Sequence, residues 1–231
     1  MLEAVAAAFE LIAAGDPTLI EIAGRSLAVS LSATVIACAV GLPIGACLAV
    51  VAFPGRGAIV VLIDSLMGLP PVVVGLLVYL LLSRAGPLGS LGLLFTPAAM
   101  VIAQSILVLP IVAALARRTA AELWSEYREQ LRSLGAGPAR QIATLLWDAR
   151  FALTTVALAG FGRASAEVGA VMIVGGNIAG VTRTMTTAIA LETGKGDLPL
   201  ALGLGLLLIG LIAVVNATVH LVDAVARHQA A

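Results

Sequence analysis

Residues 117–150, RRTAAELWSEYREQLRSLGAGPARQIATLLWDAR, form the one long polar segment of a very apolar sequence. This polar segment holds six of the chain's 13 basic residues and four of its 13 acidic residues. Leucines and charged residues recur in it at helical spacing until Gly135-Ala136-Gly137-Pro138 interrupts the pattern. Glycine suits the left-handed residue that ends a helix, and proline suits the first turn of the next helix. The segment therefore predicts a helix, a tight glycine turn and a second helix on one side of a membrane, where a partner protein can bind them.

The composition is that of an integral membrane protein. Of the 231 residues, 61% are hydrophobic and 11% are charged, and the mean hydropathy is +1.10. These values lie outside the range of soluble domains. The formal net charge is zero, which leaves no basic face for a nucleic acid partner. The sequence opens Met-Leu-Glu, with an acid where a secretory signal is basic, so we expect no cleaved signal peptide.

Apolar runs on both sides of the polar segment predict an all-α, polytopic membrane protein with about five transmembrane helices in one domain. Each run has about 20 residues or more, enough to cross a hydrocarbon core of about 30 Å. The predicted spans lie near residues 26–52, 58–83, 96–116, 151–175 and 199–222. Gly41 and Gly45 in the first span let another helix come close. Pro70 and Pro71 remove backbone donors and bend the second span.

The distribution of basic residues predicts the orientation of the chain, because cytoplasmic loops carry the excess of arginine and lysine. One side of the membrane receives Arg56, the polar segment and Arg227; the other receives Arg25, Arg84, Arg183 and Lys195. We therefore expect the N-terminus outside, and the polar segment and the tail of residues 223–231 in the cytoplasm.

The segment before the first span, residues 1–25, is predicted to be extracytoplasmic. Its apolar residues Leu2, Val5, Phe9 and Ile12 follow one helical stripe, which is typical of a helix lying in the membrane interface. A helix that faces the solvent is the alternative. Asp16-Pro17 then predicts the N-cap and first turn of the next helix.

Two charged residues, Arg163 and Glu167, lie within the predicted fourth span. Their separation of four residues puts them on one face of a continuous helix. A charge at mid-membrane costs about 2.5–3.5 kcal/mol on insertion scales, so neither side chain should face lipid. The pair then either neutralises itself and fixes helix packing, or lines or gates a polar pathway.

A stretch rich in glycine and threonine follows, GGNIAGVTRTMTT at residues 175–187. Clustered glycines expose backbone N–H groups, and threonine hydroxyls and Arg183 add further donors. Oxyanions are held by such donors. The candidate residues are Gly176, Asn177, Thr182, Arg183 and Thr184. An ordinary outer loop with a capped helix would have a similar sequence.

Patterns typical of catalysis or cofactor binding are missing from the sequence. Gly194-Lys195-Gly196 lacks the Ser or Thr of a phosphate-binding loop. His220 and His228 have no companion ligands for a metal. We therefore predict no enzyme, no metal, no cofactor and no ATP site in this chain.

The polar segment resembles the cytoplasmic loop of ATP-binding-cassette importer permeases. Glu129-Gln130-Leu131-Arg132-Ser133-Leu134-Gly135 is similar to the E-A-A-x-x-x-G motif of that family. Gln130 and Leu131 replace the two alanines, and Leu145-Leu146-Trp147-Asp148 stands where the family has I-x-L-P.

A second segment narrows this resemblance. GRASAEVGA at residues 162–170, followed by Gly176-Asn177-Ile178 and Thr182–Ile189, resembles the G-R-A-x-x-E-x-G-A…G-N-I segment of permeases for tetrahedral oxyanions. Molybdate, sulfate and tungstate importers share this segment, and the sequence here looks most like that of the tungstate type. The resemblance covers about residues 25–222.

The resemblance implies a type I importer permease fold and a homodimer in the cell inner membrane. Two copies of a separate ATPase would dock on the cytoplasmic loops, and an extracytoplasmic binding protein would deliver the anion. Glu129, Arg132, Leu134 and Gly135 would lie in the ATPase cleft. Transport would follow alternating access, with tungstate as the expected substrate and molybdate or sulfate as alternatives. A membrane scaffold without a pathway and a passive anion channel are the alternatives from other classes.

Overall fold

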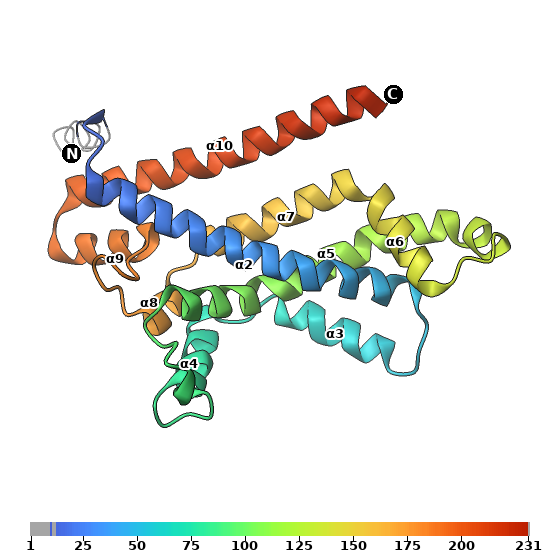
Figure 1. Ribbon diagram of the computed structural model, residues 1–231, viewed down its shortest axis with the longest axis horizontal. Coiled ribbons are helices and arrows are strands. Elements are labelled where there is room, and N and C mark those ends of the chain that lie inside the picture. Colours follow the sequence, from blue (N-terminus) through green and yellow to red (C-terminus); the bar gives the residue numbers. More distant parts are fainter. Residues whose placement is uncertain (1–9, 11–12, 231) are drawn as a thin grey trace. The chain divides into compact units, whose positions relative to one another are not determined.

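The computed structural model describes Glu10 and residues 13–230, and these residues form helices and no strands (Figure 1). The all-α fold class is therefore confirmed. The predicted interfacial helix falls largely on residues 1–9, 11 and 12, outside the described residues. In chain order the helices are α2 (Pro17–Val50), α3 (Arg56–Leu66), α4 (Pro71–Leu82), the short 3₁₀ helix η1 (Gly89–Leu91), α5 (Pro97–Ser133), α6 (Pro138–Asp148), α7 (Arg150–Ser165), α8 (Gly169–Gly175), α9 (Met185–Lys195) and α10 (Leu198–Ala230).

Prolines and caps determine where several helices begin. Pro17, Pro71, Pro97 and Pro138 are each the first residue of a helix, where the missing N–H costs no hydrogen bond. Ahead of α2, Asp16 Oδ1 accepts hydrogen bonds from the backbone N–H of Thr18 (2.8 Å) and of Leu19 (3.2 Å). The predicted N-cap at Asp16 is therefore confirmed.

The chain divides into two compact units, each with its own core. The first unit comprises residues up to Ser32, Pro71–Gln104 and Ser165 onward. Its apolar core joins α2 and α9 to α10 through five buried side chains: Leu19, Ile22, Met185, Ala188 and Leu204. Within the same unit α4 packs closely on α8, since a Cβ on Gly75 would lie only 2.8 Å from the Cα of Ala170.

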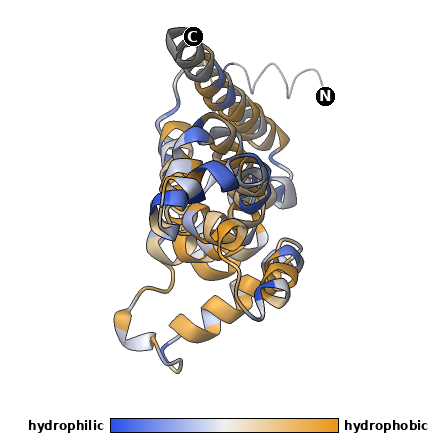
Figure 2. Cartoon of the chain, turned by 90° about the vertical axis from the view of Figure 1, so that its right-hand side faces the viewer, coloured by the Kyte–Doolittle hydropathy of each residue, from blue (hydrophilic) through white to orange (hydrophobic). Residues whose placement is uncertain are grey.

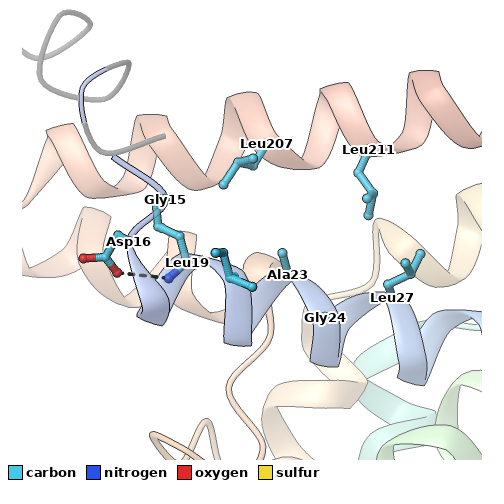
Figure 3. Close-up of a pocket in the computed structure, with 9 residues that line it drawn as sticks. Gly15, Asp16, Leu19, Ala23, Gly24, Leu27, Leu207 and Leu211 are labelled. Carbon is cyan, nitrogen blue, oxygen red and sulfur yellow. Dashed lines mark hydrogen bonds between the residues drawn. The ribbon is translucent and has the colours of Figure 1, made fainter. Parts of the chain in front are cut away.

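Figure 3 shows the part of this unit where Leu207 and Leu211 of α10 point toward α2. Between the two helices lies a groove of about 290 Å³, lined mainly by apolar side chains that include Leu19 and Leu27. Gly24 lies on the α2 wall of the groove, and a Cβ there would meet nothing within 4 Å. The groove is suited to hydrocarbon rather than to a polar solute.

The second unit, Ala33–Pro70 and Ser105–Ala164, has a core built from small side chains. Its main cluster of buried residues is Ala37, Val108, Val112, Ala116, Ala149, Leu153, Val156 and Ala164. Close packing depends on glycine here: a Cβ on Gly45 would lie 2.5 Å from the carbonyl oxygen of Ala113, and one on Gly41 would lie 2.9 Å from Val112. The close approach predicted for Gly41 and Gly45 is confirmed, with α5 as the partner helix.

Three of the described helices, α2, α5 and α10, are long and apolar enough to cross a membrane. Up to five spans result if the pairs α3–α4 and α6–α7 each count as one bent span, so five spans remains a prediction. The break predicted at Pro70-Pro71 is present, since α3 ends at Leu66 and α4 begins at Pro71. Figure 2 shows the hydrophobic colour along much of the helical ribbon, as a bilayer requires.

Two boundaries differ from the prediction. The third span and the first helix of the polar segment are a single helix, α5, of 37 residues. The fourth predicted span, near 151–175, is not one helix: α7 ends at Ser165 and α8 begins at Gly169.

Candidate functional site

The polar segment ends α5 with a complete helix-terminating motif. Gly135 has φ +69°, a left-handed conformation that costs a residue with a Cβ free energy. The N–H of Gly135 donates to the carbonyl of Arg132, and the N–H of Ala136 donates to that of Leu131, both at 3.0 Å. These two bonds form a Schellman motif. The predicted helix–glycine–helix geometry is therefore confirmed.

The second helix of the polar segment is held to the first by a polar side chain and an apolar face. Gln141 Nε2 donates to the carbonyl of Ala136 at 2.7 Å, which locks the turn onto α6. On the same helix Ile142 and Leu146 pack against a buried cluster formed by Ala46, Ala49 and Ala120. The turn is thus connected through α6 to buried side chains of this unit.

The candidate coupling residues Glu129, Arg132, Leu134 and Gly135 are all exposed at this end of the hairpin. Two large apolar side chains accompany them: Leu134 is 73% exposed and Trp147 is 69% exposed. The guanidinium of Arg150 lies 5.0 Å from the ring centroid of Trp147, within the range of a cation–π contact. Exposed leucine and tryptophan beside charged residues are typical of a surface that binds a protein partner.

The other candidate residues lie mainly in the first unit, and one expectation about them is wrong. Arg163 lies in the last turn of α7, whereas Glu167 lies beyond the end of that helix. The two residues therefore do not share a face of one continuous helix. The chain leaves the helix here because the carboxylate of Glu167 accepts the N–H of Ala170 (3.0 Å), and its carbonyl accepts the hydroxyl of Thr186 (2.8 Å).

The threonines between α8 and α9 hold the shape of that connection. The hydroxyl of Thr182 donates to the carbonyl of Gly175 (2.5 Å) and accepts the N–H of Ile178 (3.0 Å). Thr184 caps α9 in a reciprocal capping box with Thr187. These hydroxyls form hydrogen bonds within the connection, which is also what the alternative of an ordinary loop with a capped helix predicts.

The glycine-rich turn itself needs left-handed backbone at three residues. Gly176 has φ +70°, Asn177 has φ +50° and Gly180 has φ +73°. Asparagine is among the few residues with a side chain that adopt this conformation readily. Nδ2 of Asn177 donates to the carbonyl of Thr187 at 3.4 Å, which ties the turn to α9.

Two residues of α2 that were not among the candidates anchor this connection. The guanidinium of Arg25 donates to the carbonyls of Gly180 (2.8 Å) and Arg183 (3.3 Å). At the next residue, Ser26 Oγ accepts the N–H of Met185 at 2.7 Å. These partners lie more than 150 residues apart in the sequence. No local spacing pattern links residues so far apart, so only the structure finds them.

Arg183 and Asn177 keep unused hydrogen-bonding atoms at this site. The Nε of Arg183 and the Oδ1 of Asn177 are buried and lack a hydrogen-bond partner among the residues that the structure describes. A guanidinium donates to an oxyanion in a fixed fork geometry. Of the five residues singled out in the stretch 175–187, Arg183 therefore keeps the strongest capacity to bind an anion.

These features define a class of protein: an all-α, multi-pass membrane protein with a helix–glycine–helix hairpin and a cationic, glycine-rich turn. No family model matches the chain. Individual relatives do. This chain is 41% identical over 218 residues to a tungstate uptake system permease protein of Peptoclostridium acidaminophilum. The matched residues span 94% of this chain and 96% of that protein.

Two further relatives are similar at the same level. A probable anion ABC transporter permease protein of Haloferax volcanii is 42% identical over 205 residues, 86% of this chain and 88% of that protein. A tungstate uptake system permease protein of Campylobacter jejuni is 42% identical over 159 residues, 69% of this chain and 66% of that protein. The chain belongs to the permease family of ATP-binding-cassette importers. It is accordingly a transport subunit and not an enzyme.

Proposed function

We propose that this permease moves tungstate into the cell. The observation that carries the proposal is the 41% identity to a tungstate uptake permease over nearly the full length of both chains. Molybdate and sulfate are the alternative substrates, because they present the same tetrahedral arrangement of oxygens to hydrogen-bond donors. Substrate choice then rests mainly with the binding protein that delivers the anion.

The energy for transport comes from a separate ATPase, of which two copies dock on a permease homodimer. Glu129, Arg132, Leu134 and Gly135 contact the ATPase cleft, with Trp147 as a further apolar anchor. The exposure of these residues and the rigidity of the turn support this assignment. Closure of the ATPases displaces the turn, and α5 and α6 carry that displacement toward the membrane, giving alternating access.

The homodimer is supported by the burial of the long helices. In the most apolar window of α5, 61% of the residues are buried within the chain, against 17% for α10. A second copy related by two-fold symmetry would cover such an exposed face. The N-terminus lies outside and the C-terminus inside, which places the polar segment beside the ATPase.

The pathway includes Arg163, Glu167 and the loop with Gly176, Asn177, Thr182, Arg183 and Thr184. Arg183 attracts the anion, and Thr182 and Thr184 hold the loop in shape. Glu167, in the break between α7 and α8, acts as a gate where two helix segments can move separately. Unwound segments that line a cavity are tolerated at membrane depth.

Uptake into proteoliposomes tests this function. The vesicles contain the permease, its ATPase and its binding protein, and they receive tungstate, molybdate or sulfate with or without ATP. We expect ATP-dependent accumulation of tungstate, with less molybdate and no sulfate. Equal movement without ATP would indicate a channel. No movement of any oxyanion through an assembled complex would indicate a scaffold.

A further inference from the structure

The connection between α4 and α5 forms a cavity whose lining includes none of the proposed pathway residues. Its volume is about 530 Å³, and its walls include Tyr79, Leu82, Arg84, Leu94 and Phe95. All of these residues belong to the first unit. The lining combines two aromatic rings and two leucines with one guanidinium, so the cavity suits a molecule that is part apolar and part anionic.

The walls of this cavity are held by specific contacts. The rings of Tyr79 and Phe95 meet edge to face with their centroids 6.2 Å apart. Phe95 has φ +62°, which is unusual for a bulky residue, and its N–H donates to the carbonyl of Val174 at 3.0 Å. The N–H of Leu88 donates back to the carbonyl of Leu81 at 3.0 Å. The cavity is therefore a built feature of the fold.

Arg84 is the cation of this cavity, and no described residue pairs with its charge. The residue is exposed, and its guanidinium makes no hydrogen bond or ion pair with any residue in the described part of the structure. An unpaired guanidinium beside aromatic walls is a receptor for phosphate, which it binds through two parallel N–H···O hydrogen bonds.

An exposed apolar stripe on α4 leads to Arg84. Leu77, Leu80 and Leu81 are each about half exposed, at 54%, 53% and 45%. Leu77 and Leu80 lie three residues apart and so share one face of α4, and Arg84 lies in the turn that follows the helix. The stripe ends where α4 ends at Leu82, so Arg84 follows directly after the last apolar turn.

We propose that this cavity binds a membrane phospholipid. The phosphate pairs with Arg84, the glycerol backbone lies in the cavity against the walls formed by Tyr79 and Phe95, and an acyl chain lies along Leu77 and Leu80. A free oxyanion could use Arg84 but would leave the aromatic and leucine walls in contact with water. The lipid matches both parts of the site: the guanidinium by charge, and the walls and stripe by apolar surface.

Binding of lipid to the purified full-length protein tests the proposal. The delipidated protein in detergent is titrated with dioleoylphosphatidylglycerol, and native mass spectrometry counts the lipids retained on each chain. The phosphate-free dioleoylglycerol serves as the matched probe. This readout is independent of transport, so it does not depend on which oxyanion the permease carries.

We expect Arg84→Gln to lower retention of the phospholipid about fivefold, the effect of one basic residue at an anionic membrane surface. The variant should retain dioleoylglycerol like the unchanged protein. Arg84→Lys should restore most of the phospholipid retention, because the charge is kept. Leu94→Trp should lower retention of both lipids by filling the cavity. Arg56→Gln, in the other unit, is the control and should change neither.

Three results would overturn the proposal. The first is equal phospholipid retention by the unchanged protein and by Arg84→Gln when both show the same thermal unfolding. The second is Arg84-dependent binding of inorganic phosphate or tungstate without any difference in lipid, which would identify a free-oxyanion site. The third is an Arg84→Gln variant that differs from the unchanged protein in oligomeric state, measured by light scattering, but not in lipid retention. That result would identify a contact between copies of the chain.

Discussion

The guanidinium of Arg117 lies 3.3 Å from the carboxylate of Asp64 and so joins α5 to α3 within the second unit. Only one of the two hydrogen bonds that this pair can form is present. Asp64 Oδ1 and Arg117 Nε are both buried and lack a hydrogen-bond partner among the described residues. A guanidinium and a carboxylate can form two parallel hydrogen bonds, so a small approach of the two helices would add the second one.

We expect the Asp64–Arg117 pair to contribute modestly to stability. Its side chains are 35% and 19% exposed, and partly solvated pairs contribute about 0.2–1 kcal/mol. A double-mutant cycle with Asp64→Asn and Arg117→Gln, followed by thermal unfolding in detergent, measures the coupling. Arg118→Gln, at the exposed neighbouring arginine, is the control. A coupling of several kcal/mol would show that the pair behaves as a fully buried one.

The left-handed backbone at Gly135 gives a second prediction. Gly135→Ala should destabilise the turn by about 1–2 kcal/mol, because a Cβ is disfavoured at φ +69°. Gly135→Pro should leave the membrane domain folded and abolish uptake while ATP hydrolysis continues. Gly137→Ala is the matched control, since Gly137 has an ordinary φ of −71° and open space around its Cα. Normal uptake by Gly135→Pro would remove this turn from the coupling mechanism.

Two glycines of α2 should respond in opposite directions to the same substitution. Gly45→Ala places a methyl group 2.5 Å from the carbonyl oxygen of Ala113 and should lower the unfolding free energy by about 1–3 kcal/mol, as overpacking does. Gly24→Ala meets nothing within 4 Å and should raise it by up to about 1 kcal/mol through helix propensity. Thermal unfolding of both variants checks this; equal effects would mean that the close approach at Gly45 can relax.

Two substitutions at the break between α7 and α8 distinguish the structural role of Glu167 from its functional role. Thr186→Val removes the hydrogen bond to the Glu167 carbonyl and should cost about 0.5–1.5 kcal/mol of stability. Glu167→Gln keeps an oxygen that can accept the N–H of Ala170, so the fold should survive. Uptake should nevertheless fall. Glu126→Gln, an exposed acid of the polar segment, is the control.

The same assay weighs the scaffold alternative. Arg163→Ala and Glu167→Ala should both abolish uptake if these residues line or gate the pathway. Full uptake by both variants, at normal levels of folded protein, would leave them a packing role only.

Residues that cap or break helices allowed much of this fold to be predicted from the sequence. The Asp16-Pro17 cap, the break at Pro70-Pro71 and the turn at Gly135 all follow from properties of proline, glycine and aspartate that act within a few residues. The structure has each of them at the predicted place. Hydropathy likewise predicted the all-α membrane class.

Tertiary contacts decided what the sequence could not predict. The chain leaves the helix at Ala166–Val168 without a proline or glycine in that stretch. Thr186, 19 residues further on, supplies a hydrogen bond to Glu167 that helical backbone would otherwise provide. The anchoring of Gly180 by Arg25 spans 155 residues. Helical periodicity carries no information about such pairs, so the assumed continuous helix through Glu167 was wrong.

The continuity of α5 has a mechanical consequence. A helix of 37 residues is about 55 Å long at 1.5 Å per residue. It starts at Pro97 among apolar residues and ends at Ser133, one residue before the exposed Leu134. A rod of that length that pivots by one degree about one end moves its other end by roughly 1 Å. A small change in the angle of α5 at the glycine turn therefore becomes a displacement at the far end of the helix.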